Sequence, residues 1–205
     1  ADTYSYLNRD LEKEEYREGI YVGYRYFDSF GVKPLFSFGY GLSYTSFGLE
    51  LRDLQTEKSS VQARVAVKNT GKSYAGREVV QVYVSFPRSG IEKESRRLAG
   101  FAKTARLMPG ESREVVVEIR QKQLAVFSEE RQAWIVEAGT YGIWVGNSLD
   151  SAVLSAYLTV SREVVLEKTH RICPRKEPFE ELCRNSSGNS ETRAEEAKEK
   201  AIPVY

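Results

Sequence analysis

Carboxyl side chains are the groups of this chain best suited to hydrolytic chemistry. Two of them can act together when their surroundings keep one protonated, as the acid, and the other ionised, as the nucleophile or base. The candidates lie on predicted solvent-facing strand faces or in loops, where nothing separates their pKa values: Glu111, Glu114, Glu118, Glu129 and Glu130. We therefore predict no catalytic residue in this chain.

Histidine, cysteine and glycine offer no better candidates. His170 is the only histidine and lies in a charged tail, so we expect a solvated side chain rather than a member of a catalytic triad. Together with Cys173 and Cys183 it falls short of the four ligands of a zinc site. We expect free thiols, although a bridge across this spacing stays open. Gly39 and Gly41 precede no helical pattern and no basic residue, so they do not predict a phosphate site. The sequence predicts neither a metal nor a cofactor.

The N-terminal part of the chain is predicted to form a buried strand and then a tight passage. Residues 19–27 are apolar or aromatic at almost every position, which indicates a strand covered on both faces. Gly31 and Pro34 break this pattern. Gly39 and Gly41 then suit a place where backbone approaches backbone, because a residue without a Cβ reaches positive φ at no steric cost. This combination is typical of a domain junction.

After Tyr44 the pattern predicts an antiparallel β-sandwich of the immunoglobulin-like class, with seven or eight strands in about 120 residues. Apolar residues alternate with polar ones in short segments: 47–51, 61–67, 80–84, 98–107, 115–119, 134–136, 141–145 and 152–160. Gly71 is able to take a left-handed conformation in its turn, and Gly110 is expected to accept the unusual dihedral of its own turn. Residues 121–127 are expected to form a helical turn, and 162–169 to extend the last strand.

Composition excludes several classes of function. Thirty basic residues face 29 acidic ones, so no strong field would attract nucleic acid or an anionic membrane. No apolar run approaches the ~20 residues of a membrane span, and the N-terminus lacks the pattern of a signal peptide. The compartment stays open, with the bacterial cytoplasm as the expectation.

Six motifs resemble the C-terminal part of glycoside hydrolase family 3 enzymes of the β-glucosidase type. They follow one another in the order of that family: Tyr16–Phe47 (YREGIYVGYRYFDSFGVKPLFSFGYGLSYTSF), Val65–Gly71, Gly76–Pro87, Leu98–Phe101, Leu107–Ser112 and Val136–Ser148. The resemblance implies a mainly β chain in three parts. Residues 1–37 would be a remnant of an α/β sandwich domain, 38–160 a fibronectin type III-like domain, and 161–205 a partly irregular tail or interdomain linker.

The same resemblance implies a structural function. Retaining glycosidases place two carboxyl groups about 5 to 5.5 Å apart, and the family carries them on a barrel and an α/β domain whose motifs are absent here. The chain would therefore be inactive alone and would pack on and orient the catalytic domains of a parent β-glucosidase or β-xylosidase, its only route to a carbohydrate substrate. The long tail also resembles the connection to a barrel in circularly permuted bacterial members, and both domain orders stay open.

The alternative is an autonomous carbohydrate-binding or adhesion module, because sugars stack on aromatic rings. The aromatic residues of the sandwich are spread over several strands: Tyr83, Trp134, Tyr141, Trp144 and Tyr157. Five more gather near the N-terminus: Tyr16, Tyr21, Tyr24, Tyr26 and Phe27. For this second group we favour core and junction packing, next to a structural ion pair between Arg25 and Asp28. A third possibility is that the chain itself is an active enzyme.

Overall fold

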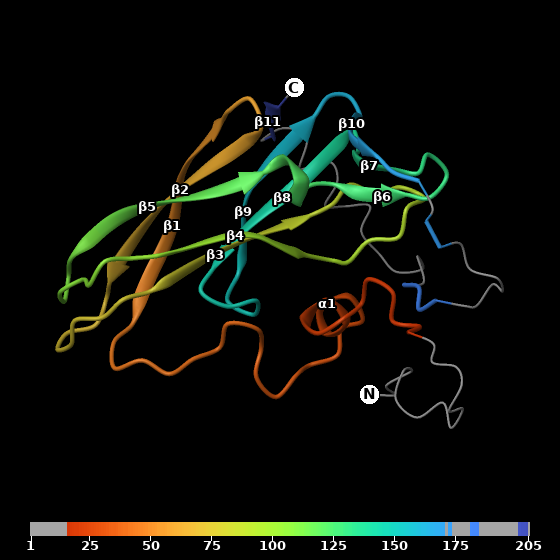
Figure 1. Ribbon diagram of the computed structural model, residues 1–205. Coiled ribbons are helices and arrows are strands. Elements are labelled where there is room, and N and C mark those ends of the chain that lie inside the picture. Colours follow the sequence, from red (N-terminus) through yellow and green to blue (C-terminus); the bar gives the residue numbers. More distant parts are fainter. Residues whose placement is uncertain (1–15, 171, 174–180, 185–200, 205) are drawn as a thin grey trace.

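The computed structural model describes residues 16–170, 172–173, 181–184 and 201–204, which form a β-sandwich with one short helix (Figure 1). The elements are α1 (Tyr24–Ser29), β1 (Phe47–Thr56), β2 (Ser60–Asn69), β3 (Val79–Ser85), β4 (Arg97–Lys103), β5 (Ser112–Arg120), a 3₁₀ helix (Gln121–Gln123), β6 (Val126–Ser128), β7 (Ala133–Val136), β8 (Gly139–Gly146), β9 (Val153–Val160), β10 (Val164–Lys168) and β11 (Ala201–Val204). In this described part no helix is long and apolar enough to span a bilayer.

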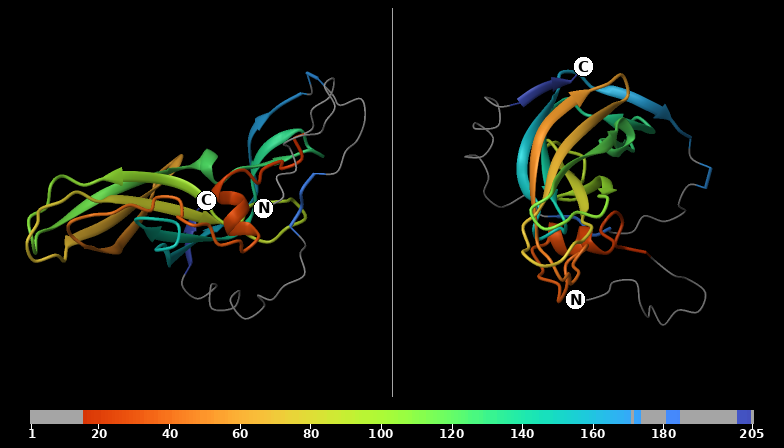
Figure 2. Two further views of the ribbon diagram at one scale, coloured as in Figure 1. Left: turned by 90° about the horizontal axis from the view of Figure 1, so that it is seen from below. Right: turned by 90° about the vertical axis from the view of Figure 1, so that its left-hand side faces the viewer.

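Two sheets enclose the core, and a third, smaller sheet lies at one end (Figure 2). The first has the order β1-β2-β5, the second β11-β9-β8-β3-β4, and the third β10-β7-β6. Neighbouring strands are antiparallel except β11, which pairs with β9 in parallel. Val65 of β2 lies opposite Leu51 of β1 and Val115 of β5, so apolar side chains align across the first sheet. The predicted antiparallel sandwich is confirmed.

The buried stripes of the central strands are those that the alternation predicts. On β2 the side chains of Val61, Ala63, Val65 and Val67 all belong to the core cluster. β3 differs, because Gln81 and Tyr83 on its other face are buried as well. Tyr83 packs there with Leu149 and Ala152, and Tyr24 of α1 covers this second cluster. The five-stranded sheet is thus covered on its outer face too.

The strand predicted at residues 19–27 is wrong. The chain turns at Gly23, which has φ 62°, and then forms α1. Tyr24 and Asp28, one helical turn apart, both reach β4 or the loop before it. A run that is apolar at nearly every position is compatible with both the strand period of two residues and the helical period of 3.6 residues. Here the contacts of one helical face with the sandwich select the helix.

Beyond β5 two further expectations need correction. The helical turn at 121–127 is present only as far as Gln123, because β6 begins at Val126. Residues 162–169 do not extend β9; they form β10, which pairs with β7 of the small sheet. Nine strands lie between Phe47 and Val160, more than the predicted seven or eight.

A buried asparagine organises the turn after β2. The Asn69 side chain donates to the carbonyl oxygens of Tyr74 (2.9 Å) and Leu107 (3.0 Å), and its Oδ1 accepts from Gly71 N (3.0 Å). Gly71 does not adopt the left-handed conformation that its turn allows. Glycine is required there for another reason, since a Cβ would lie 2.0 Å from Thr45 Oγ1. Gly110 does have the predicted left-handed conformation, with φ 80°.

Three buried tyrosines make the fold sensitive to alkali. Burial raises the pKa of Tyr21, Tyr83 and Tyr141 well above the ordinary value near 10, and the Glu92 carboxylate raises that of Tyr21 further. Because the folded pKa lies above the unfolded one, this stability is present below about pH 10 and is lost as the pH rises towards the folded value.

We expect about three of the thirteen tyrosines to stay un-ionised in the folded protein at a pH where the guanidinium-unfolded chain is fully ionised. Phenolate absorbance at 295 nm, titrated for both states, measures the difference. Coincident titration curves, with circular dichroism still native, would contradict this reading of the core.

Candidate interdomain docking surface

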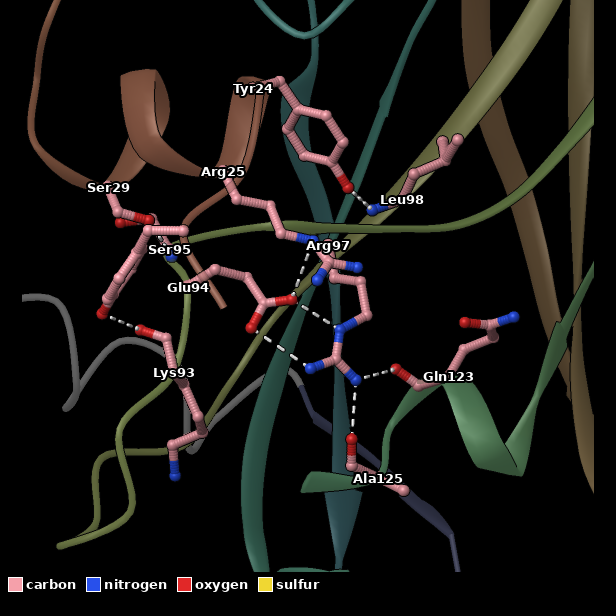
Figure 3. Close-up of polar contacts among 11 residues, drawn as sticks. Tyr24, Arg25, Ser29, Lys93, Glu94, Ser95, Arg97, Leu98, Gln123 and Ala125 are labelled. Atoms are coloured by element: carbon pink, nitrogen blue, oxygen red, sulfur yellow. Dashed lines mark hydrogen bonds and ion pairs between the residues drawn. The ribbon is translucent and has the colours of Figure 1, made fainter. Parts of the chain in front are cut away.

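Helix α1 is fixed to the sandwich by a buried carboxylate (Figure 3). The Glu94 side chain, fully buried in the loop between β3 and β4 (residues 86–96), accepts two hydrogen bonds from Arg97, at 2.7 Å from Nε and 3.1 Å from Nη2. Nε of Arg25 on α1 lies 3.5 Å from the same carboxylate. We call Arg25, Glu94 and Arg97 the Glu94 cluster. One carboxylate thus joins the helix, the loop and β4.

Arg97 joins this cluster to the connection between β5 and β6. Its Nη1 donates to the carbonyl oxygens of Gln123 (3.3 Å) and Ala125 (2.6 Å), and its guanidinium carbon lies 4.6 Å from the centre of the Phe86 ring. Burial by itself would raise the pKa of Glu94, but the hydrogen bonds and charge of Arg97, helped by Arg25, lower it below the ordinary value. The carboxylate is therefore held ionised, as a structural anion.

The predicted pair between Arg25 and Asp28 is wrong. Asp28 instead accepts two hydrogen bonds from Arg96, one of them 3.1 Å from Nε. Arg96 also donates to Leu149 O (3.2 Å), and its guanidinium lies 5.0 Å from the Trp144 ring centre. The loop between β3 and β4 thus supplies Glu94 for Arg25 and Arg96 for Asp28. Arg96 can donate two hydrogen bonds to the Asp28 carboxylate, which is a stronger geometry than a pair with Arg25 on the same helix.

The aromatic residues near the N-terminus mostly pack as predicted. Tyr21 is 1% exposed and donates to the Glu92 carboxylate and to Lys93 O (3.2 Å). Tyr24 accepts from Leu98 N (2.9 Å) and packs against Tyr83. The Tyr26 ring packs against the rings of Phe27 and Phe30. Tyr16 is exposed.

The close backbone approach predicted at the two junction glycines occurs at one of them. Gly39 has φ 87°, and a Cβ there would lie 3.0 Å from Asn147 O and 2.3 Å from Gln81 Nε2. The neighbouring Phe38 O accepts from Leu149 N (2.9 Å), which ties this segment to the turn between β8 and β9. Gly41 has open space around it and no left-handed conformation, so the prediction is wrong there.

The segment after α1 carries several large exposed apolar side chains. We call residues 31–44 the junction strip; it runs along one edge of the molecule from α1 to the start of β1 (Figure 1). Leu35, Leu42 and Tyr44 are at least 90% exposed, and four others are also exposed: Val32, Phe36, Phe38 and Tyr40. Single apolar residues are normal on a surface, but so many large ones in one short segment make it a candidate interaction site.

A cavity of about 610 Å³ lies between α1 and the first part of the junction strip. Apolar side chains form most of its wall: Tyr24, Phe27, Phe36, Phe38 and Leu149. Three charged side chains also line it: Asp28, Lys33 and Asp150. Because Asp28 is paired with Arg96, the helix wall of the cavity is held in place. Together the cavity and the junction strip form a surface that can receive protruding apolar side chains of a partner.

The residues considered first for chemistry lie elsewhere. Of the five glutamates only Glu111 is half-buried, and the Met108 N–H and Arg113 lower its pKa; Glu114, Glu118, Glu129 and Glu130 are exposed. His170 is exposed, and so are the free thiols of Cys173 and Cys183. The described residues contain no group of three or more His, Cys, Asp or Glu side chains that could hold a metal ion.

Sequence reasoning missed the residues that hold α1. The sequence predicts a polar loop at RSGIEKES, where charges are dense, yet Lys93 and Glu94 are buried. Lys93 pairs with Glu137 and donates to Ser89 Oγ (2.5 Å). The only hint in the sequence is the near balance of opposite charges within the loop, which suits mutual pairing.

Comparison with known proteins supports the family resemblance. The family model of the fibronectin type III-like domain matches residues 78–149. Thermostable beta-glucosidase B of Acetivibrio thermocellus is 39% identical over 172 residues, covering 80% of this chain and 22% of the relative. A beta-glucosidase of Ruminococcus albus is 36% identical over 192 residues, covering 91% of this chain and 20% of the relative.

Solved structures show the same relationship. Beta-glucosidase 3B from Thermotoga neapolitana superposes with a TM-score of 0.73 at 40% identity, over 80% of this chain and 22% of that one. A beta-glucosidase from Paenibacillus barengoltzii gives 0.75 at 34% identity, over 83% and 20%. The chain spans about a fifth of the length of these relatives. It contains a fibronectin type III-like domain and belongs to the C-terminal region of glycoside hydrolase family 3 enzymes of the β-glucosidase type.

Proposed function

We propose that this chain is a non-catalytic structural part of a family 3 glycosidase, of the β-glucosidase or β-xylosidase type, and packs on the catalytic domains of its parent. The junction strip is the observation that carries this proposal. Fully burying one large apolar side chain contributes about 1.5 to 3 kcal/mol, and Leu35, Leu42 and Tyr44 are almost fully exposed. A partner that covers them gains that energy.

The way α1 is held supports an orienting role. The Glu94 cluster and the pair of Asp28 with Arg96 fix the helix and the cavity wall to the sandwich. A domain docked on this surface would therefore take one orientation. An active site assembled between domains depends on a fixed domain orientation, because a displacement of about 1 Å is enough to lower the reaction rate. The carbohydrate substrate would meet this chain only through the parent.

We also propose the division into 1–37, 38–160 and 161–205. The ion pairs of α1 with Glu94 and Arg96 hold the segment 1–37 against the domain 38–160. A match that covers 91% of a 205-residue chain must extend well past Val160, so the Ruminococcus albus relative has a counterpart to much of the tail. This favours the tail as an interdomain connection that belongs to the family, as a permuted domain order requires.

Reactivity of Lys33 tests the docking proposal. Lys33 lines the cavity, and Lys68 on the outer face of β2 is an exposed control. With the full-length product of the gene, we expect acetylation of Lys33 by an N-hydroxysuccinimide ester to be several-fold slower than with the 205-residue chain. Lys68 should react equally in both. Mass spectrometry of the peptides measures both rates.

Equal reactivity of Lys33 in the two proteins would overturn docking at this surface. An open reading frame without further domains would remove the partner itself and leave the alternative, a carbohydrate-binding module. The feature that favours the alternative is Trp134, exposed on β7 with Phe127 beside it at 5.4 Å between ring centres. Cello-oligosaccharides should leave the tryptophan fluorescence of the chain unchanged, and the chain alone should not hydrolyse an aryl β-glucoside.

A further inference from the structure

Strand β9 differs in composition from the other strands at the edges of the two large sheets. β1, β4 and β5 are edge strands, and each carries charged residues. β9, with the sequence VLSAYLTV, has no charged residue, no proline and no glycine, and only β11 lies between it and the edge of its sheet. Proteins use charges and prolines to prevent sheet edges from pairing with other chains. The sequence of β9 itself contains neither.

The part of β9 that β11 covers is four residues long. The register between β8 and β9 shifts at Ser155, where one extra residue forms a bulge. Beyond this bulge β11 pairs with β9 in parallel, from Ala201 opposite Tyr157 to Val204 opposite Val160 (Figure 1). Alternate side chains of residues 157–160 belong to the core cluster, so the sandwich itself holds this backbone in place. The short strand β11 pairs with the whole of this stretch.

Residues 201–204 have the features of a strand that closes an edge. The strand is short, and Pro203 has no N–H, so a further strand would find an incomplete set of hydrogen-bond donors on it. Proline is tolerated in a sheet where its nitrogen faces away from the neighbouring strand. Because N–H groups alternate in direction along a strand, we expect Ile202 and Val204 to direct theirs towards β9. Four residues would bind weakly from solution, but attachment to the same chain raises their local concentration.

We propose that residues 157–160 form a strand-acceptor site and that residues 201–204 occupy it, which withholds this edge from a second copy of the chain. Strand addition to a sheet edge is a general mode of recognition in which the main chain supplies the affinity. With the site empty, the sequence YLTV would be an uncharged, β-prone edge through which two copies can pair. This inference goes beyond the proposed function and does not depend on it.

Amide hydrogen exchange of the 205-residue chain tests the occupant. In the unchanged protein the amides of Ile202 and Val204 should exchange slowly. Ile202→Pro removes a donor to β9, so Val204 and those amides of residues 157–160 that do not bond to β8 should exchange about tenfold faster or more, as in a locally opened segment. Pro203→Ala is the matched control, because its added N–H faces away from β9, and it should leave these amides slow. Random-coil exchange at Ile202 and Val204 in the unchanged protein, or no effect of Ile202→Pro, would overturn the proposal.

Sedimentation velocity tests what the occupant excludes. A chain shortened to residues 1–200 should show a several-fold higher dimer fraction than the 205-residue chain at the same concentration. Thr159→Lys in the shortened chain should reverse this rise, because pairing of two β9 strands would bring the added charges together. The junction strip is the same in all three proteins, so association through it would not respond to Thr159→Lys.

The core reports whether a variant still folds. The amide of Val82 in β3 should keep its protection throughout; if the shortened chain loses it, Ile202→Pro takes its place in the sedimentation experiment. Equal dimer fractions with and without the occupant, or a rise that persists in Thr159→Lys, would show that residues 201–204 do not withhold β9 from a second copy. The Lys33 test reports on the cavity, so it is decided separately.

Discussion

Replacing Arg97 with alanine should lower the free energy of unfolding by about 3 to 5 kcal/mol, the usual cost of removing one partner of a buried ion pair. The substitution leaves the fully buried carboxylate of Glu94 with Arg25, 3.5 Å away, as its remaining cation among the described contacts. It also removes both hydrogen bonds to the carbonyl oxygens of Gln123 and Ala125. Denaturant unfolding followed by circular dichroism measures the loss.

Arg52→Ala is the matched control for that experiment. Arg52 pairs with Glu50 at 2.7 Å, but both side chains are at least half exposed, so the expected loss is about 0 to 1 kcal/mol. A similar small loss for Arg97→Ala would show that the Glu94 cluster does not stabilise the fold.

Acid should weaken the same cluster in a predictable direction. Because the folded pKa of Glu94 is lowered, the stability it contributes is present above the ordinary carboxyl pKa and is lost as the pH falls through the folded value. The difference between the unchanged protein and Arg97→Ala should therefore shrink in acid. A difference that is constant from neutral pH into acid would assign the loss to packing and neutral hydrogen bonds.

Replacing Asp28 with alanine should release α1 and cost about 3 kcal/mol, the low end for breaking a buried pair. Arg96, which is 17% exposed, would be left between the Trp144 ring and Leu149 O without its counter-ion. At the end of α1 the hydrogen bond from Phe30 N to Tyr26 O (3.0 Å) should open, so the Phe30 amide should exchange faster. Denaturant unfolding and amide exchange measure the two effects.

Asp53→Ala provides the comparison for Asp28→Ala. Asp53 is exposed on β1 and accepts only from the nearby Gln55 side chain among its described contacts. It should lose well under 1 kcal/mol and leave Phe30 unchanged. If Asp28→Ala kept the protection of Phe30, the helix would be held by its aromatic contacts with Tyr83 and Phe38 rather than by charge.

The sandwich could be predicted because its information is local. Apolar residues at every second position of β2 and β3 can be buried together only by an extended strand with one face inward. Gly110 sits in a turn whose dihedrals follow from Pro109 and the glycine itself, and its φ of 80° confirms this. Such features need no knowledge of distant parts of the chain.

The candidate docking surface could not be predicted in the same way. Arg25 and Asp28 look like partners in the sequence, yet their counter-ions come from Glu94 and Arg96, about seventy positions away. The loop that contains Glu94 has the composition of a solvated segment. The folded structure buries Lys93 and Glu94 of this loop, and burial then makes pairing obligatory.

The sequence by itself determined the fold class of this protein, its family, and a set of motifs without a recognisable catalytic pair. Periodicity and turn residues act over a few positions, and the motifs are contiguous, so both can be read along the chain. The tertiary structure alone decided that residues 24–29 are a helix, that the junction strip is exposed, and that the tail returns to Arg17 and Glu92. These depend on long-range contacts, whose free energy is gained only after the sandwich has brought distant segments together.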